Sequence, residues 1–148
     1  MDIRDALVLD AFAGAGSLGF EAASRGAKQV VCIEKDKQAA AQLKSNCQAL
    51  DANAQIQVLQ GDFFAKCRSL TEPFDLIFID PPFHKGLVPQ VFQALIDNTL
   101  LDSGSLIYLE QESNNQFDLM SSEWGSQFEL VKGKNAGQVS AQLYRYLS

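Results

Sequence analysis

Short apolar runs alternate along the chain with longer segments in which apolar residues recur every three or four positions. The runs are rich in Val, Ile, Leu and Phe and are bounded by turn residues, which is typical of strands, whereas the longer spacing is typical of amphipathic helices. Strands are therefore predicted at 6–11, 29–34, 56–59, 74–80, 105–110, 128–131 and 140–146. Helices are predicted at 17–25, 36–50 and 87–100, with shorter ones opening at 61–64 and within the polar segment 111–124.

The order of these elements predicts the fold class. Nearly continuous apolar strands that alternate with helices indicate a parallel sheet covered on both faces. The last two strands follow each other across the turn-rich segment 132–137, which predicts a closing antiparallel pair. We therefore predict an α/β fold with a doubly wound, mostly parallel, seven-stranded sheet, an antiparallel C-terminal strand and a single domain spanning 1–148. Several aromatic side chains are expected in its core, namely Phe64, Phe74, Phe78 and Phe92.

The composition, 47% hydrophobic and 20% charged, is that of a soluble globular protein. No apolar run approaches the roughly 20 residues that cross a bilayer, and Met1–Asp5 lacks the basic region of a signal peptide, so we expect a cytoplasmic protein. Cys32, Cys47 and Cys67 form no C-x-x-C pair, which argues against a disulfide framework and a zinc site. Buried or half-buried thiols in a reducing compartment are expected instead, and no metal.

The chain is acidic, with a formal net charge of -6 and a pI near 4.6. This balance argues against nucleic-acid binding through the overall field of the protein. Any such contact needs a local basic patch or a segment outside this chain. Lys85, Lys132, Lys134 and Arg145 are candidates for phosphate contacts if they share a face, and are otherwise solvated side chains.

A carboxylate follows each of the first four predicted strands: Asp10, Glu34, Asp62 and Asp80. Ligands of doubly wound sheets bind at the carboxyl ends of the strands, so these four side chains are expected to share one site. The first strand is also followed by a G-x-G-x-x-G sequence at Gly14, Gly16 and Gly19. By itself this glycine pattern fits a dinucleotide site, an S-adenosylmethionine (AdoMet) site or a tight turn without ligand.

Each strand-end residue is expected to bind a different part of the ligand. Glu34 can accept hydrogen bonds from ribose hydroxyls. Asp62 and Phe63 can bind the amine edge and the face of an adenine, while Asp62 can also cap a helix. Asp10 favours AdoMet over NAD, because the amino group and the sulfonium of AdoMet are both cationic. We include Phe12, in the same loop, among the cofactor-binding residues.

Asp80-Pro81-Pro82-Phe83 stands directly after a buried strand. A carboxylate, two rigid prolines and an aromatic ring at the mouth of a sheet can hold a planar, amine-bearing group and accept its hydrogen bonds. His84, the only histidine, is interpreted as a contact or bystander and not as a catalytic residue.

These motifs resemble a known family. The [D/N]-P-P-[Y/F/W] signature is that of class I AdoMet-dependent methyltransferases acting on exocyclic or amide nitrogens. Residues 8–27, 31–36 and 78–83 resemble the RsmD family of 16S rRNA guanine-N2 methyltransferases. The resemblance implies AdoMet as cofactor and 16S rRNA, or a small-subunit assembly intermediate, as partner, with no membrane and a monomeric enzyme.

The same resemblance assigns roles to the motif that follows the fourth strand. Asp80 and the backbone carbonyl of Pro81 would accept the two N–H bonds of the guanine amine. Pro82 would fix the loop and Phe83 would stack on the base. Family members carry an Arg- and Gly-rich stretch before the first strand, whereas this chain begins at Met1, so we expect an intact cofactor pocket but lowered RNA affinity.

Other readings stay open at this point. An adenine-N6 or a protein-glutamine methyltransferase shares the motif, although Asp at position 80 disfavours glutamine. A nicotinamide-dependent oxidoreductase fits the glycines and Glu34 but leaves the Asp-Pro-Pro-Phe sequence as a mere loop. A non-catalytic AdoMet-binding module fits the short start of the chain.

Overall fold

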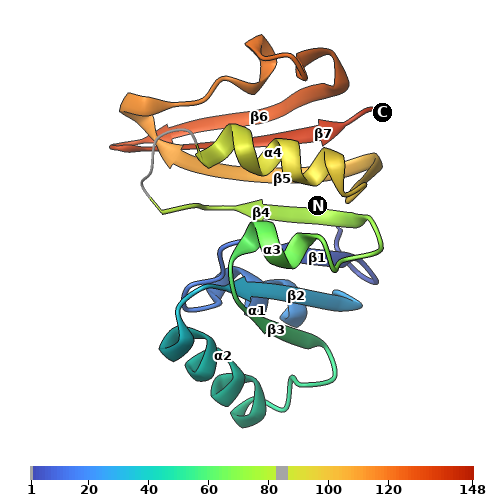
Figure 1. Ribbon diagram of the computed structural model, residues 1–148, viewed down its shortest axis with the longest axis vertical. Helices are drawn as coiled ribbons and strands as arrows, with labels where there is room; N and C mark the ends of the chain where they lie inside the picture. The colour runs from blue at the N-terminus through green and yellow to red at the C-terminus, as the bar shows by residue number, and fades with distance from the viewer. Residues whose placement is uncertain (1, 83–86) are drawn as a thin grey trace.

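A single sheet organises the protein, whose computed structural model describes residues 2–82 and 87–148. Within these residues seven strands follow the spatial order β3-β2-β1-β4-β5-β7-β6, in which β1 to β5 run parallel and β7 is antiparallel to both neighbours. The strands are β1 Leu7–Asp10, β2 Gln29–Glu34, β3 Ile56–Gln60, β4 Phe74–Ile79, β5 Leu101–Glu112, β6 Phe128–Ala136 and β7 Val139–Tyr146. This arrangement confirms the predicted α/β fold (Figure 1).

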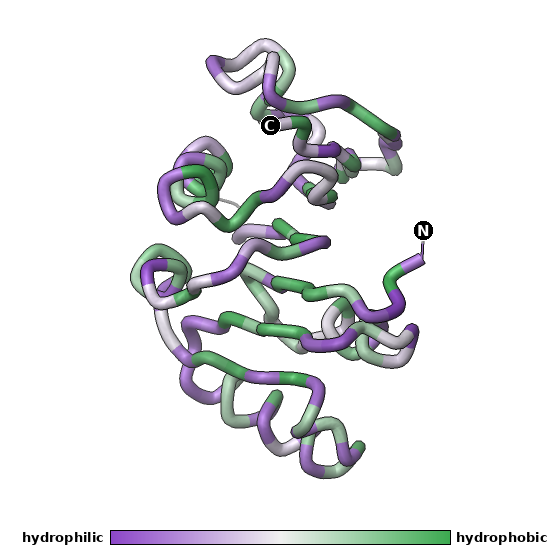
Figure 2. The backbone as a smooth tube through the Cα atoms, turned by 90° about the vertical axis from the view of Figure 1, so that its right-hand side faces the viewer, coloured by the Kyte–Doolittle hydropathy of each residue, from purple (hydrophilic) through white to green (hydrophobic). Residues whose placement is uncertain are grey.

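Helices cover both faces of the sheet (Figures 1 and 2). They are α1 Ser17–Ser24 and α2 Lys37–Ala49 on one face, and α3 Phe63–Cys67 and α4 Leu87–Asp97 on the other. Successive residues of a strand point to opposite faces. Val8 of β1 therefore packs in the core on the side of α1 and α2, while Leu9 packs on the side of α3 and α4. The winding reverses between β1 and β4, which opens a crevice at the carboxyl ends of these strands.

An aromatic cluster closes the core beyond α4. The ring of Phe92 lies 5.6 Å from that of Phe128, 6.1 Å from that of Phe117 and 6.4 Å from that of Trp124, centroid to centroid. Phe92 is fully buried and Trp124 is 8% exposed. The short helix predicted within 111–124 appears only as 3-10 turns, at Ser113–Asn115 and Leu119–Ser121, because aromatic packing and not a helical apolar stripe fixes this segment.

Strand β6 is longer than its apolar pattern predicts. Residues 132–136, predicted as loop, belong to the strand, and the chain turns at Gly137 with φ of 63°. After Phe128 every residue of β6 is exposed, because β6 is the edge strand and no helix covers it. An exposed edge strand needs no alternation of apolar and polar residues, so hydrophobic periodicity could not reveal its end. A bulge interrupts its pairing with β7 between Leu130 and Lys132.

The cysteines are buried and unpaired, as predicted. Burial raises the pKa of the Cys32 thiol, and the nearby Asp10 carboxylate raises it further. Among residues 2–82 and 87–148, no helix is long and apolar enough to cross a membrane. The same residues contain no group of three or more His, Cys, Asp or Glu side chains that could hold a metal ion.

Replacing Phe92 by Ala should lower the free energy of unfolding by about 3–5 kcal/mol, because it leaves a cavity among three aromatic rings. Denaturant unfolding measures this loss. The control is Leu50→Ala, since Leu50 is 66% exposed and its truncation should change stability by less than about 0.5 kcal/mol. Equal losses in the two variants would show that the aromatic cluster does not stabilise the packing of α4 against the sheet.

Candidate active site

A pocket of about 500 Å³ lies at the carboxyl ends of β1 to β4, where the winding reverses. Its wall brings together seven of the predicted site residues, namely Phe12, Gly14, Glu34, Asp62, Phe63, Asp80 and Pro82. Ala11, Ile33, Lys35, Gly61, Phe64 and Leu87 complete the lining. Three of the four strand-end carboxylates, Glu34, Asp62 and Asp80, therefore meet around one cavity, whereas Asp10 does not line it.

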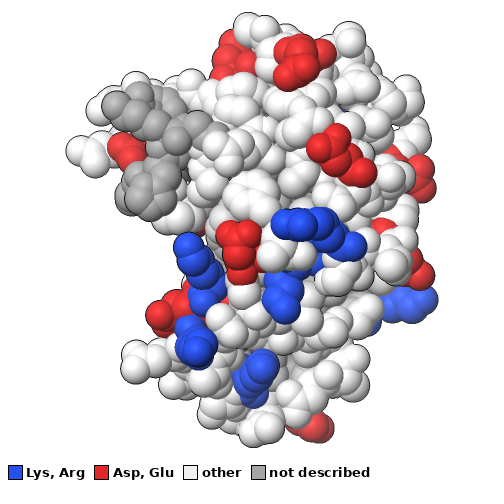
Figure 3. Space-filling view, viewed as in Figure 1, with Lys and Arg blue, Asp and Glu red and all other residues white. Residues whose placement is uncertain are grey.

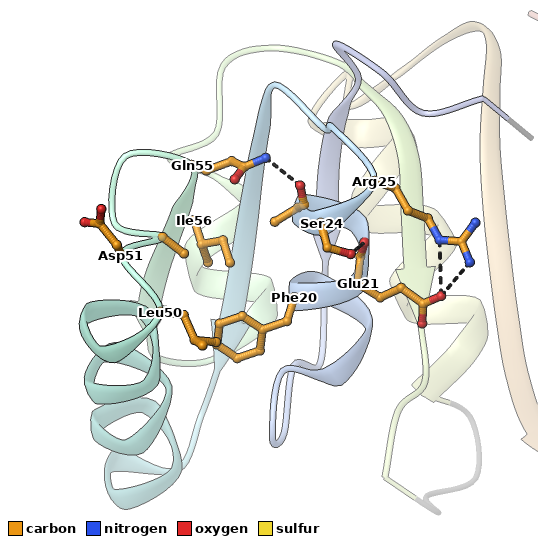
Figure 4. A pocket seen from close by; sticks show the side chains of 10 residues that line it. Phe20, Glu21, Ser24, Arg25, Leu50, Asp51, Gln55 and Ile56 are labelled. Atoms are coloured by element: carbon orange, nitrogen blue, oxygen red, sulfur yellow. Dashed lines mark hydrogen bonds and ion pairs between the residues drawn. The ribbon is translucent and has the colours of Figure 1, made fainter.

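A larger cavity of about 840 Å³ lies between the C-terminal ends of α1 and α2 (Figure 4). The half-buried Phe20 and the exposed Leu50 form its apolar side. Several of its polar groups are already engaged: Arg25 pairs with Glu21 at 2.9 Å, and the Gln55 amide donates to the carbonyl of Ala23 at 2.8 Å. It lacks all four strand-end carboxylates, so the smaller pocket is the candidate active site.

Glu34 holds the glycine loop in place through hydrogen bonds to the backbone. One carboxylate oxygen of Glu34 accepts from the backbone N–H of Gly14 at 2.8 Å, and the other accepts from the N–H of Asp36 at 2.8 Å. Gly14 and Gly16 have φ values of 55° and 82°, in the left-handed region that favours glycine. Glu34 thus positions the loop, and its remaining lone pairs still face the pocket that it lines.

Asp10 lies behind the pocket wall, with 2% of its surface exposed. Burial, with the added charges of Asp80 and Glu34, raises its pKa to about 7. The backbone N–H groups of Phe12 and Gly19 hydrogen-bond to the Asp10 carboxylate and oppose this shift. Asp10 therefore acts on the pocket through its charge and by holding the loop, and its predicted contact with a cationic ligand stays a prediction.

Three aromatic side chains, Phe12, Phe63 and Phe64, line the pocket. Phe63 is 3% exposed and its ring lies 5.4 Å from that of Phe12, so it supports the pocket from the core. Phe64, predicted as core, is half-buried and lines the pocket, because adjacent residues in one helical turn point in different directions. Asp62 accepts from the N–H of Ala65 at 3.1 Å, which confirms its helix-capping role.

The Asp-Pro-Pro segment forms the mouth of the pocket. The Asp80 side chain is exposed at this mouth, Pro81 is buried, and Pro82 is exposed on the pocket wall. Partial burial raises the pKa of Asp80, and the neighbouring Glu110 raises it further through its charge and a hydrogen bond. Phe83, His84 and Lys85 lie outside the described residues, so the stacking role of Phe83 stays a prediction.

Two residues of the site were missed from the sequence, Tyr108 and Glu110 on β5. The Tyr108 hydroxyl donates to Glu110 at 2.7 Å. Only the sheet register indicates that these residues belong to the site. β4 pairs with β5 so that Phe78 lies opposite Tyr108 and Ile79 opposite Leu109. The residues that follow, Asp80 and Glu110, are therefore neighbours. A linear sequence does not reveal this pairing. Pocket residues Lys35 and Leu87 were also missed, because neither belongs to a recognised motif.

Three of the four candidates for phosphate contacts lie on one face of the β6–β7 hairpin. Register places Lys132 opposite Leu143, Lys134 opposite Ala141 and Glu129 opposite Arg145, so the two lysines and Arg145 lie on one face of the β6–β7 hairpin. Arg145, however, pairs with Glu129 at 2.5 Å. Lys85 lies outside the described residues. Lys132 and Lys134 therefore remain as the exposed candidates for phosphate contacts.

The strand order, the glycine loop after β1 and the Asp-Pro-Pro segment after β4 define a class I methyltransferase fold. The family model described as conserved hypothetical protein 95 matches residues 1–145. The chain is 40% identical over 146 residues to ribosomal RNA small subunit methyltransferase D of Haemophilus influenzae, covering 97% of this chain and 73% of that protein. The Escherichia coli protein of the same name is 36% identical over 143 residues, with coverages of 97% and 70%.

Solved structures agree with this assignment. A crystal structure of a Haemophilus influenzae protein described as a candidate methylase has a TM-score of 0.88 at 39% identity, covering 99% of this chain and 82% of that one. The chain therefore belongs to the conserved hypothetical protein 95 family, which is the RsmD family. Its relatives are methyltransferases, which implies use of AdoMet.

Two glycine variants should separate the binding and the folding roles of the loop. A Cβ at Gly14 meets no atom within 4 Å, so Gly14→Ala should fold at a cost of about 1–2 kcal/mol for its φ and lose affinity for S-adenosylhomocysteine (AdoHcy). A Cβ at Gly16 overlaps the Leu43 side chain, so Gly16→Ala should mainly lower the melting temperature. Scanning fluorimetry and calorimetry with AdoHcy measure both. Unchanged AdoHcy affinity in Gly14→Ala would contradict the assignment of this loop.

Replacing Asp10 by Asn should stabilise the protein at alkaline pH. The pKa of Asp10 is about 7 in the folded chain against an ordinary 3.8, so its contribution to stability falls as pH rises from about 4 to about 7. Asn removes this titration, so the variant should melt higher than wild type at pH 8, by roughly 3 °C for each kcal/mol gained, and not at pH 3.5. The same difference at both pH values would contradict the buried charge of Asp10.

Proposed function

We propose that this protein transfers a methyl group from AdoMet to the exocyclic N2 amine of a guanine in 16S rRNA. One observation carries the proposal: Asp80, at the mouth of the pocket, opens onto the same cavity as the glycine loop, Glu34 and Asp62. An acceptor for an amine thus adjoins a cofactor-sized cavity. The relatives named ribosomal RNA small subunit methyltransferase D support RNA as the substrate.

The residues of the pocket fit AdoMet. Its volume of about 500 Å³ falls within the range of roughly 300–1,000 Å³ that is typical of small-molecule sites. Glu34 would accept hydrogen bonds from the ribose hydroxyls, and Asp62 would accept from the adenine amine. Phe12 and Phe64 offer apolar surface to the adenine ring. When bound, AdoMet supplies a methyl carbon activated by the adjacent sulfonium.

Asp80 and Pro81 would activate the amine by orienting it. The guanine amine is a weak nucleophile because its lone pair is delocalised into the ring. Acceptance of its two N–H bonds by the Asp80 carboxylate and the Pro81 carbonyl turns the lone pair toward the methyl carbon and stabilises the positive charge that develops on nitrogen. Holding the two reacting atoms about 3–3.5 Å apart supplies much of the acceleration.

The target guanine would have to leave its stack to reach the mouth of the pocket. Exocyclic amines inside a duplex are out of reach of a recessed site, so an RNA loop or a partly assembled subunit is the natural substrate. Pro81 and Pro82 restrict the backbone next to Asp80, which keeps the acceptor oriented for the entering base. Phe83 would stack on that base.

A local basic patch supports contact with RNA despite the net charge of -6. Figure 3 shows Lys and Arg side chains gathered over α3 and the adjoining part of α2. Lys66 lies in α3, the exposed Lys37 opens α2, and the exposed Lys35 lines the pocket itself. In the described part of the chain none of these lysines forms an ion pair. Phosphates flanking a bound guanine could therefore contact them.

Replacing Asp80 by Ala should abolish methyl transfer while AdoHcy affinity stays within a few-fold, because Asp80 contacts the amine and not the adenosine moiety. Tritiated methyl transfer from AdoMet to 16S rRNA and to small-subunit particles measures the first effect, and calorimetry the second. The matched control is Asp97→Ala, an exposed carboxylate at the far end of α4.

Mass spectrometry of the methylated nucleosides decides the target. N2-methylguanine is expected, whereas N6-methyladenine, or methylation of a glutamine peptide in place of RNA, would contradict the proposal. Thermal stabilisation by NADH and not by AdoHcy would instead indicate an oxidoreductase. Retained turnover in Asp80→Ala would remove this residue from the mechanism.

A further inference from the structure

Glu110 lies beside the candidate catalytic carboxylate although it belongs to another strand. The register of β4 and β5 pairs Phe78 with Tyr108 and Ile79 with Leu109, and Asp80 and Glu110 are the residues that directly follow this last pair. Side chains alternate along a strand, which places Tyr108, Glu110 and Asp80 on one face of the sheet. The rings of Phe78 and Tyr108 pack edge to face with their centroids 5.9 Å apart. This pair lies two residues before Asp80 and Glu110 along the strands.

Partial burial raises the pKa of Asp80, and the neighbouring Glu110 carboxyl raises it further. The Tyr108 hydroxyl donates to Glu110 at 2.7 Å, so Glu110 accepts from one side and faces Asp80 on the other. The pKa of Tyr108 is raised to about 12, so this hydroxyl remains a donor throughout the pH range of an assay.

Other titratable groups surround Asp80 and Glu110 on several elements. On β5 the neighbouring titratable groups are Tyr108 and Glu112, and on β1 the nearest is Asp10, whose pKa responds to Asp80. On the other side β7 presents Ala141 opposite Glu110, with Lys134 of β6 beyond it. Glu34, Lys35 and Asp62 line the same pocket as Asp80, and Glu110 is its acidic neighbour on the adjacent strand.

We propose that Glu110, held in place by Tyr108, makes Asp80 the acceptor of the proton that the methylated amine must lose. This inference rests on the proposed function and assigns a new role within it. The guanine nitrogen forms a bond to the methyl carbon as the carbon–sulfur bond breaks, with that electron pair staying on sulfur. One N–H bond of the amine then breaks, its electrons remain on nitrogen, and the proton joins a carboxylate oxygen of Asp80.

The role of Glu110 is electrostatic. The efficiency of a general base rises with its proton affinity, so an aspartate with a raised pKa accepts the proton more effectively than an ordinary one. A neighbouring carboxylate increases the proton affinity of the aspartate, because two like charges close together do not both ionise easily. Glu110 is therefore a positioning residue that acts through Asp80 and touches neither the base nor the cofactor.

The decisive variant is Glu110→Gln, which keeps the shape and the acceptor for Tyr108 but removes the charge. Carbon-13 NMR of aspartate-labelled protein, with the Asp80 signal assigned by its loss in Asp80→Asn, follows the titration of Asp80 without substrate. We expect a lower titration midpoint in Glu110→Gln than in wild type. The matched control is Glu112→Gln, which removes the same charge from the next position on the same face of β5 and should leave the midpoint unchanged.

Kinetics on 16S rRNA test the consequence. In Glu110→Gln the acid limb of the pH–rate profile should move to lower pH, and the plateau rate should fall roughly tenfold or more, as expected when a positioned base is weakened. Glu110→Asp, which keeps the charge, should recover part of this loss. AdoHcy affinity and melting temperature should match wild type, which excludes misfolding as the cause.

The outcomes separate this inference from the proposed function. An Asp80 midpoint that is the same in wild type and Glu110→Gln overturns the inference, whatever the substrate. An unchanged acid limb in an active Glu110→Gln enzyme overturns it as well. If instead the wild-type protein methylates no guanine while the NMR midpoints differ as expected, the proposed substrate fails and the carboxyl pair stands.

Discussion

Every polar group of the pocket depends on one constraint, the parallel pairing of β1 with β2 on one side and β4 on the other. Asp10 lies opposite Cys32 of β2 and Phe78 of β4, so the three strands end at nearly the same level. Their helices diverge to opposite faces at this point, and the space between them becomes the pocket. A slip of β4 by one residue would turn Asp80 to the other face of the sheet and separate it from Glu110.

The same pairing concentrates negative charge in a small volume. Burial, together with the charges of Asp80 and Glu34, raises the pKa of Asp10 to about 7. Such a site is costly to the protein without a positive counter-charge, and a pyrophosphate would increase the repulsion. A ligand that carries an ammonium and a sulfonium would offset it. The electrostatics of the pocket therefore favour AdoMet over a dinucleotide, in agreement with the methyltransferase names of the relatives.

The parts of the structure that local chemistry determines could be predicted from the sequence. Buried strands produce apolar runs, and left-handed turns select glycine, so the sheet, Gly14 and the strand-end carboxylates were recognisable. Whatever depends on the neighbouring strand could not be predicted. Glu110 lies in a strand with an ordinary apolar pattern, and only the register of β4 with β5 gives it a partner. The exposed half of β6 was mistaken for a loop because a strand open to water carries no apolar pattern.

The edge strand β6 also affects how chains meet one another. A strand with a free edge can pair with a strand of another chain and extend the sheet between molecules. Here the bulge after Leu130 breaks the regular spacing of donors and acceptors, and Lys132 and Lys134 place two ammonium groups along the same strand. A second copy approaching this edge would meet a mismatched ladder and like charges, which oppose edge-to-edge pairing.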